Sequence, residues 1–103
     1  MNSLAGGGQR ILRLIVPVEI EQLIKKIHPN LKRKLRASLD LIASKPDSGK
    51  ALFDELEALR SFRVSSFRII YRVADPKRIE IIAIGPRKQI YEETARILRK
   101  QRK

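Results

Sequence analysis

Two adjacent apolar segments, residues 67–74 and 79–84, constrain the fold of this chain more than any other feature. In residues 67–74, FRIIYRVA, aromatic and branched residues occupy the odd positions, and both arginines occupy even positions. Side chains alternate between the faces of a strand, so one face requires a core and the other suits an anion. Residues 79–84, IEIIAI, are apolar on both faces, which is typical of a central strand.

The beginning of the chain predicts a short strand followed by a helix. Residues 10–16, RILRLIV, form an apolar run of strand length. Pro17 suits the first turn of a helix, where its missing N–H is harmless. The apolar residues that follow keep helical spacing and define one stripe: Ile20, Leu23, Ile24 and Ile27.

A second helix is predicted after a break at His28-Pro29. The residue before a proline disfavours the α conformation, which ends the first helix. Asn30 is then the expected N-cap of the next helix. One face of that helix is apolar: Leu31, Leu35, Leu39 and Ile42. Residues 17–44 therefore predict a helical hairpin whose stripe covers one face of the sheet.

The second half of the chain predicts an antiparallel meander. Residues 45–50 read as a loop, and residues 51–59 as a short helix or an irregular link. Strands are expected at 60–65, 67–74 and 79–85, with turns at Ser65-Ser66 and at residues 75–77. A last helix is expected from Tyr91 to Arg102. The order β-α-α-β-β-β-α defines an α+β fold with a small, mainly antiparallel sheet, and leaves its second face free to bind.

Length and composition limit the classes of protein. The 103 residues suit a single domain at 10–103, with the glycine-rich residues 1–9 as a flexible lead or cloning remnant. Cysteine is absent and there is one histidine, so we expect no disulfide and no metal or other cofactor. No apolar run has membrane-spanning length, so no membrane partner is expected, and cytoplasmic location fits.

The charge points to an anionic partner. The chain has 23 Lys and Arg against 11 Asp and Glu, a formal net charge of +12. Residues 60–103 hold 13 of the basic residues and 4 of the acidic ones, so the excess is concentrated there. Nucleic acid is the favoured partner. An acidic protein, an anionic membrane surface and a merely well-solvated basic surface remain alternatives.

The residues that remain for chemistry are cations and a tyrosine. Nucleotide-binding loops and paired carboxylates are missing, and His28 reads as a turn residue. The candidates are Arg63, Arg68, Arg72, Arg87, Lys88 and Tyr91. Converging arginines suit the extra charge of a phosphoryl transition state. A tyrosine serves as a base at neutral pH only beside several cations, so Tyr91 needs both Arg68 and Arg87.

Arg72 and the two tyrosines also have a purely structural interpretation. Arg72 stands near a strand end, where it is equally suited to be surface charge. Tyr71 alternates with core residues and is expected in the core. Tyr91 forms a helical stripe with Ala95 and Leu98, so it is equally suited to pack inside.

Several segments together resemble the RelE/ParE superfamily of bacterial and archaeal toxins. The segments are Pro46 with Gly49-Lys50, Arg63-Val64, the run FRIIYRV at 67–73, and IIAIGPR with IYE at 81–92. The resemblance covers the chain from about residue 10. It implies a type II toxin–antitoxin toxin of the RelE branch, an endoribonuclease that cuts mRNA in the ribosomal A site without a metal. ParE-like relatives, which act on DNA gyrase, usually lack the tyrosine, so Tyr91 favours RelE.

The resemblance also assigns roles. It implies catalytic functions for Arg68, Arg87 and Tyr91, with Tyr91 assisting proton removal from the attacking 2′-hydroxyl and Arg68 stabilising the phosphorane. Many relatives carry histidine where Pro86 stands. This chain therefore lacks one possible acid–base group, and the proton transfer depends more on Tyr91. Residues expected to bind RNA are Arg63, Arg72, Lys88, Arg96 and Arg99. The implied partners are the ribosome with mRNA and a RelB-like antitoxin that forms a hetero-oligomer with the toxin.

Two other functions are compatible with the same sequence. One is a gyrase-inhibiting toxin on the same fold, whose expression causes DNA damage. The other is a degenerate toxin that only binds antitoxin or nucleic acid and tolerates loss of Arg68 or Tyr91.

Overall fold

A computed structural model describes residues 12–52, 59–75 and 78–101. Its elements are, in order, β1 (Arg13–Ile15), α1 (Val18–Lys26), α2 (Pro29–Ser44), the 3₁₀ turn η1 (Pro46–Ser48), β2 (Lys50–Ala51), β3 (Leu59–Val64), β4 (Phe67–Asp75), β5 (Arg78–Pro86) and α3 (Arg87–Gln101). The expected lead at 1–9, most of the link at 51–59, the turn residues Pro76 and Lys77, and Arg102 lie outside the described residues.

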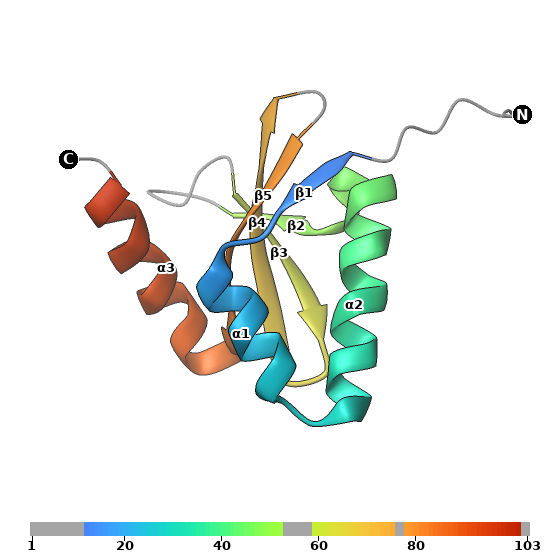
Figure 1. Ribbon diagram of the computed structural model, residues 1–103. Coiled ribbons are helices and arrows are strands. Elements are labelled where there is room, and N and C mark those ends of the chain that lie inside the picture. The colour runs from blue at the N-terminus through green and yellow to red at the C-terminus, as the bar shows by residue number, and fades with distance from the viewer. Residues whose placement is uncertain (1–11, 53–58, 76–77, 102–103) are drawn as a thin grey trace, which may run out of the picture.

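The sheet confirms the predicted α+β architecture. Its strand order is β1-β5-β4-β3-β2, with β1 parallel to β5 and the other pairs antiparallel. Strand β5 lies inside the sheet between β1 and β4, as its two apolar faces predicted (Figure 1). The Ser65-Ser66 turn joins β3 to β4, and Ser65 adopts a φ of 56° there.

The helical hairpin covers one face of the sheet, as predicted. Buried side chains from α1 and α2 meet those of the strands in one core: Ile24, Leu35, Leu39, Ile42, Ile69, Tyr71, Ile79 and Ile81. The predicted stripe of α1 holds at Ile20 and Ile24, but Leu23 is 37% exposed. The buried residues of α1 are Ile20 and Ile24, one turn apart, and Leu23 lies at the margin of the face that they define.

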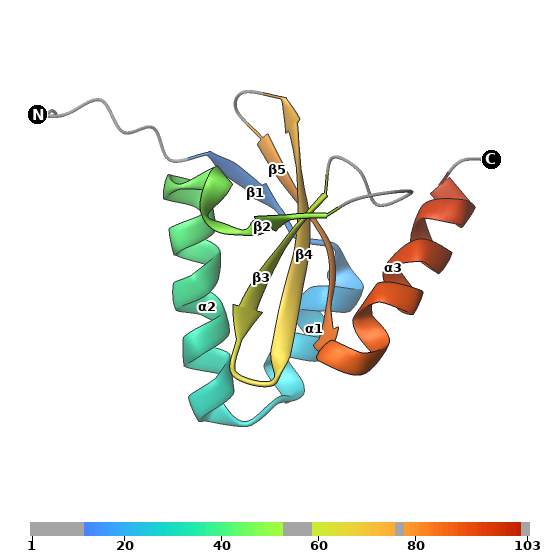
Figure 2. The ribbon, with the colours of Figure 1, turned by 180° about the vertical axis from the view of Figure 1, so that it is seen from behind.

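The second face of the sheet is not free, contrary to the sequence-based expectation. Helix α3 packs on it, opposite α2 (Figures 1 and 2), and closes a smaller core formed by Leu59, Ile70, Ile82, Ala83 and Ile90. The helix begins at Arg87, four residues before the predicted Tyr91. The early start has a physical reason: it places the apolar Ile90 within the helix, against the buried face of β5.

The helix starts also differ from expectation. Pro17 is the N-cap residue of α1 and precedes its first turn. The N-cap of α2 is His28, whose Nδ1 accepts a hydrogen bond from the Asn30 N–H at 3.1 Å. Pro29 then takes the first helical position, which suits its fixed φ. Asn30 was expected as the N-cap, but lies inside the helix, where its Oδ1 accepts from Arg33.

Tyr71 ties the segment after α2 to the sheet. Its side chain is fully buried, as predicted for a core residue. The hydroxyl donates to the Pro46 carbonyl at 2.6 Å and accepts from the Gly49 N–H at 2.8 Å. A Cβ on Gly49 would lie 2.6 Å from the Tyr71 oxygen, so only glycine permits this approach. One phenol thus satisfies the hydrogen-bonding needs of two backbone groups.

The Tyr71→Phe variant is expected to lose about 1–3 kcal/mol of unfolding free energy, because the buried Gly49 N–H and the half-buried Pro46 carbonyl lose their partner. Urea denaturation followed by circular dichroism measures the loss. Tyr91→Phe is the matched control, because Tyr91 is half-buried and the contact of its hydroxyl with Ser61 Oγ is long, at 3.5 Å. Equal stability of Tyr71→Phe and wild type would contradict the structural role given to this hydroxyl.

The same residue predicts a loss of stability at alkaline pH. Burial raises the pKa of Tyr71 above its ordinary 10.0, although the Gly49 N–H opposes the shift. Folding therefore favours the protonated phenol. The contribution of Tyr71 to the unfolding free energy is complete below pH 10 and is lost as the pH rises through the pKa of the folded state. Above pH 10 the unfolding free energy of wild type should fall more steeply than that of Tyr71→Phe. Parallel curves would show that Tyr71 ionises as easily in the folded chain as in the unfolded one.

Candidate active site

Arg63 and Arg68 lie directly opposite each other on β3 and β4, on the α3 side of the sheet. On its other side Arg68 pairs with Gly85 of β5, near the start of α3. Glycine contributes no side chain there, and a Cβ at this position would lie 3.3 Å from Ile90 Cδ1. Gly85 therefore lets Ile90 approach the sheet closely, and Ile90 fixes the position of its neighbour Tyr91.

Ser61 links Arg68 to Tyr91. Its side chain is only 3% exposed, and its Oγ accepts a hydrogen bond from Arg68 Nη1 at 3.1 Å. The same oxygen lies 3.5 Å from the Tyr91 hydroxyl, with either group able to donate. Three side chains from β3, β4 and α3 thus form one polar cluster, which we call the Arg68–Ser61–Tyr91 cluster. The guanidinium reaches the phenol through the serine.

The guanidinium of Arg68 keeps most of its hydrogen-bonding capacity. Its Nε is buried and makes no hydrogen bond within the described part of the chain. No ion pair joins Arg68 to a carboxylate among those residues, so its charge is not neutralised locally. A buried donor without a partner is costly unless a ligand accepts from it. The arrangement therefore suits an anion that arrives from outside.

Arg72, another predicted site residue, lies apart from this cluster. Arg72 is four positions along β4 from Arg68, about 13 Å at the usual rise per residue. Its Nε and Nη2 both donate to Glu80 Oε1, at 3.0 and 2.6 Å. This pairing favours the interpretation of Arg72 as structural surface charge.

The predicted residues of α3 are distributed along the helix. Arg96 pairs with Glu93, and Arg99 is exposed in the last turn. Arg87 and Lys88 occupy the first turn of α3, but their side chains lie outside what the structure describes. The predicted approach of Arg87 to Tyr91 therefore stays a prediction.

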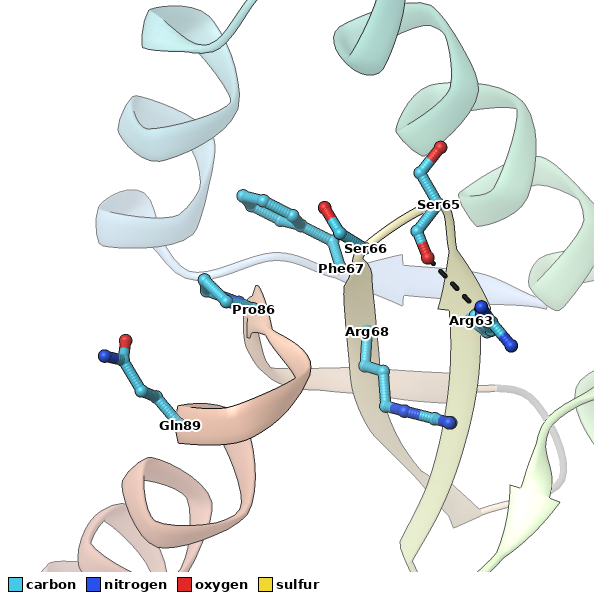
Figure 3. A pocket seen from close by; sticks show the side chains of 7 residues that line it. All are labelled: Arg63, Ser65, Ser66, Phe67, Arg68, Pro86 and Gln89. Atoms are coloured by element: carbon cyan, nitrogen blue, oxygen red, sulfur yellow. Dashed lines mark hydrogen bonds between the residues drawn. The ribbon is translucent and has the colours of Figure 1, made fainter.

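A pocket of about 460 Å³ opens beside Arg68. It lies between the β3–β4 turn and the junction of β5 with α3, and Figure 3 shows the side chains around it. Its lining combines Arg63 and Arg68 with Ser65, Ser66, Phe67, Pro86 and Gln89. The only hydrogen bond drawn among them runs from Arg63 Nε to the Ser65 carbonyl, at 3.4 Å. The volume is within the usual range for ligand pockets, about 300–1,000 Å³.

Two further findings concern metal and membrane. Among the described residues, no group of three or more His, Cys, Asp or Glu side chains has the arrangement needed to hold a metal ion. No helix in the described ranges is both long and apolar enough to cross a membrane.

Solved structures of RelE toxins share this fold. The chain is similar to the toxin of the RelBE2 complex from Mycobacterium tuberculosis (20% identity, TM-score 0.66, covering 76% of this chain and 93% of that one). It is also similar to a free mutant of Escherichia coli RelE, with 17% identity and a TM-score of 0.67 over 88% of this chain and 97% of that one. A third similar structure is the archaeal RelE–RelB complex of Pyrococcus horikoshii, with 19% identity and a TM-score of 0.62 over 75% of this chain and 96% of that one. Among curated protein sequences, none matches.

The family follows from the sequence itself. Residues 18–91 match the family described as ParE toxin of type II toxin–antitoxin systems. The chain therefore belongs to this family and is a type II toxin of the RelE/ParE superfamily. The predicted resemblance is confirmed at this level.

Sequence reasoning missed Ser61. The signal was present, because Leu59, Ser61 and Arg63 share one face of β3, and Ser61 pairs with the buried Ile70. Its partner Tyr91 depends on how α3 packs, which alternation along a strand does not reveal.

Replacing Ser61 by alanine is expected to lower the unfolding free energy by about 1–3 kcal/mol, because Arg68 then has no partner for Nη1. Urea denaturation measures the change. Ser66→Ala is the control, since that serine is exposed in the β3–β4 turn. If both serine variants are equally stable, Ser61 does not hold Arg68 in the folded protein.

Proposed function

We propose that this toxin is a ribosome-dependent, metal-independent endoribonuclease that cuts mRNA in the A site. The observation that carries the proposal is the Arg68–Ser61–Tyr91 cluster, in which a half-buried guanidinium that pairs with no carboxylate among the described residues lies one hydroxyl away from a phenol. Cations aimed at a developing charge, together with a proton acceptor, meet the needs of phosphodiester cleavage. The fold shared with solved RelE toxins supports the same class of activity.

The proposed reaction uses the RNA as its own nucleophile. The 2′-oxygen forms a bond to the adjacent phosphorus, the bond from phosphorus to the 5′-oxygen breaks, and a 2′,3′-cyclic phosphate and a 5′-hydroxyl result. Tyr91 accepts the proton of the 2′-hydroxyl. Arg68 donates to the phosphorane oxygens, and Arg87 assists with charge or with protonation of the leaving 5′-oxygen.

Ser61 gives this mechanism a physical basis that the arginines alone do not supply. While its oxygen accepts from Arg68, its proton can be donated to Tyr91, so the positive charge polarises the phenol through one hydroxyl. The cluster contributes few groups, and an ordered substrate compensates for that, since fixed geometry removes much of the entropic barrier. The ribosome is the proposed source of that order, and this substrate implies a cytoplasmic site of action.

An acidic antitoxin is the proposed protein partner. The M. tuberculosis and P. horikoshii structures are complexes, RelBE2 and RelE–RelB. A chain with a net charge of +12 suits a partner of opposite charge that neutralises it in a hetero-oligomer.

Gyrase inhibition is the second candidate, favoured by the match to the ParE toxin family. The two activities are distinguished by their targets. A gyrase inhibitor needs no ribosome and leaves translated mRNA intact, whereas a nuclease leaves DNA supercoiling unchanged.

Primer extension on mRNA translated in a purified system tests the nuclease. Wild type should produce cuts at A-site codons, and Tyr91→Phe and Arg68→Ala should each reduce the cleavage rate by about 100-fold or more, the usual effect of losing a general base or a charge-stabilising donor.

Tyr71→Phe and Arg13→Ala are the matched controls, since they change the other tyrosine and an arginine on the opposite edge of the sheet. Both should cut like wild type at a temperature where they are folded. Cleavage without ribosomes, or full activity in both site variants, would refute the mechanism. Intact mRNA together with inhibited supercoiling by gyrase would establish the second candidate.

A further inference from the structure

The pocket beside Arg68 has two chemically different sides. Phe67 and Pro86 pair directly across β4 and β5 and contribute ring surfaces. Arg63 and Arg68 contribute cations from β3 and β4. A flat apolar surface next to guanidinium groups that pair with no carboxylate among the described residues matches a nucleotide, which joins an apolar ring face to an anionic phosphate.

Arg63 is positioned to serve a second phosphate. Its side chain is exposed, and its one contact in the described structure, Nε to the Ser65 carbonyl, is long at 3.4 Å. The two outer nitrogens remain available, and paired N–H groups are the preferred donors to a phosphate. Arg63 and Arg68 face each other across one strand pair, about 5 Å apart in the backbone. They therefore suit neighbouring groups of one RNA strand.

Gln89 lies at the α3 side of the pocket. Figure 3 shows its side chain leaving the first turns of α3 on the same side as Pro86. It is exposed and makes no hydrogen bond within the described residues. An amide offers both donors and an acceptor, so it can pair with the edge of a base. Lysine or arginine at this position would offer donors but no acceptor.

We infer that this pocket binds the base of an unpaired mRNA nucleotide next to the cleaved phosphate, and that Gln89 selects among bases. The inference rests on the proposed nuclease function and adds its substrate subsite. The ring faces of Phe67 and Pro86 stack on the base, Gln89 pairs with its edge, and Arg63 holds the flanking phosphate. An unpaired base fits because proteins read RNA sequence mainly from unstacked bases.

The first test measures binding without the ribosome. Fluorescence anisotropy compares a labelled three-nucleotide RNA, with a 2′-deoxy position to prevent cleavage, and the same strand lacking its central base. Wild type should bind the complete strand at least about five-fold more tightly, the effect of one stacked base. Phe67→Leu should remove that preference while it retains the affinity for the abasic strand. Equal affinity of wild type for both strands would overturn the subsite.

The second test measures base preference in the cleavage reaction. Gln89→Ala should redistribute the cuts among A-site codons, with total cleavage within about five-fold of wild type, as expected for loss of one base contact. Gln22→Ala, at an exposed position on α1, is the control and should leave the distribution unchanged. An unchanged distribution in Gln89→Ala would overturn its role.

The two tests separate this inference from the proposed function. Base-dependent binding without mRNA cleavage would refute the nuclease and keep the pocket. Cleavage by wild type with neither base-dependent binding nor an effect of Gln89→Ala would keep the nuclease and refute the pocket. Circular dichroism of Phe67→Leu confirms that the variant is folded, because Phe67 also packs against the core under the helical hairpin.

Discussion

Two-sided burial of the β4–β5 pair is the constraint on which the rest of the structure depends. Ile69 and Ile81 face the helical hairpin, whereas Ile70 and Ile82 face α3. A strand pair that is apolar on both faces needs cover on both, so a chain of this length must form a layer of helix on each side. The hairpin precedes the sheet in the chain, so the last segment has to supply the second layer.

This constraint also locates the site. Helix α3 leaves β5 at Pro86, and its cover of the sheet is incomplete near that junction, where the pocket opens. Arg68 is on the same face as Ile70 but two residues closer to the open end. On this face of β4, the buried Ile70 and the site residue Arg68 are therefore only two positions apart. Tyr91 reaches the site because its neighbour in the helix, Ile90, is buried in the core.

The sequence predicted those parts that depend on local periodicity. Alternation in 67–74 placed Tyr71 in the core and the arginines on the other face, and it did so from the residues alone. What it did not predict depends on packing between distant segments. The early start of α3, its cover of the second face and the partners of Ser61 all follow from how residues 87–98 dock on the sheet. No periodicity within one segment carries that information.

The difference between the partners of Arg72 and Arg68 shows how the fold keeps charge available at one end of a strand. Arg72 donates twice to a carboxylate, Glu80, which neutralises it. Arg68 donates to a hydroxyl, Ser61, which orients the guanidinium and leaves its charge intact. A carboxylate at position 61 would hold Arg68 more strongly, but it would also repel a phosphate and offset the attraction that the arginine provides. A neutral acceptor is therefore the partner that fixes the arginine without competing with an anionic substrate.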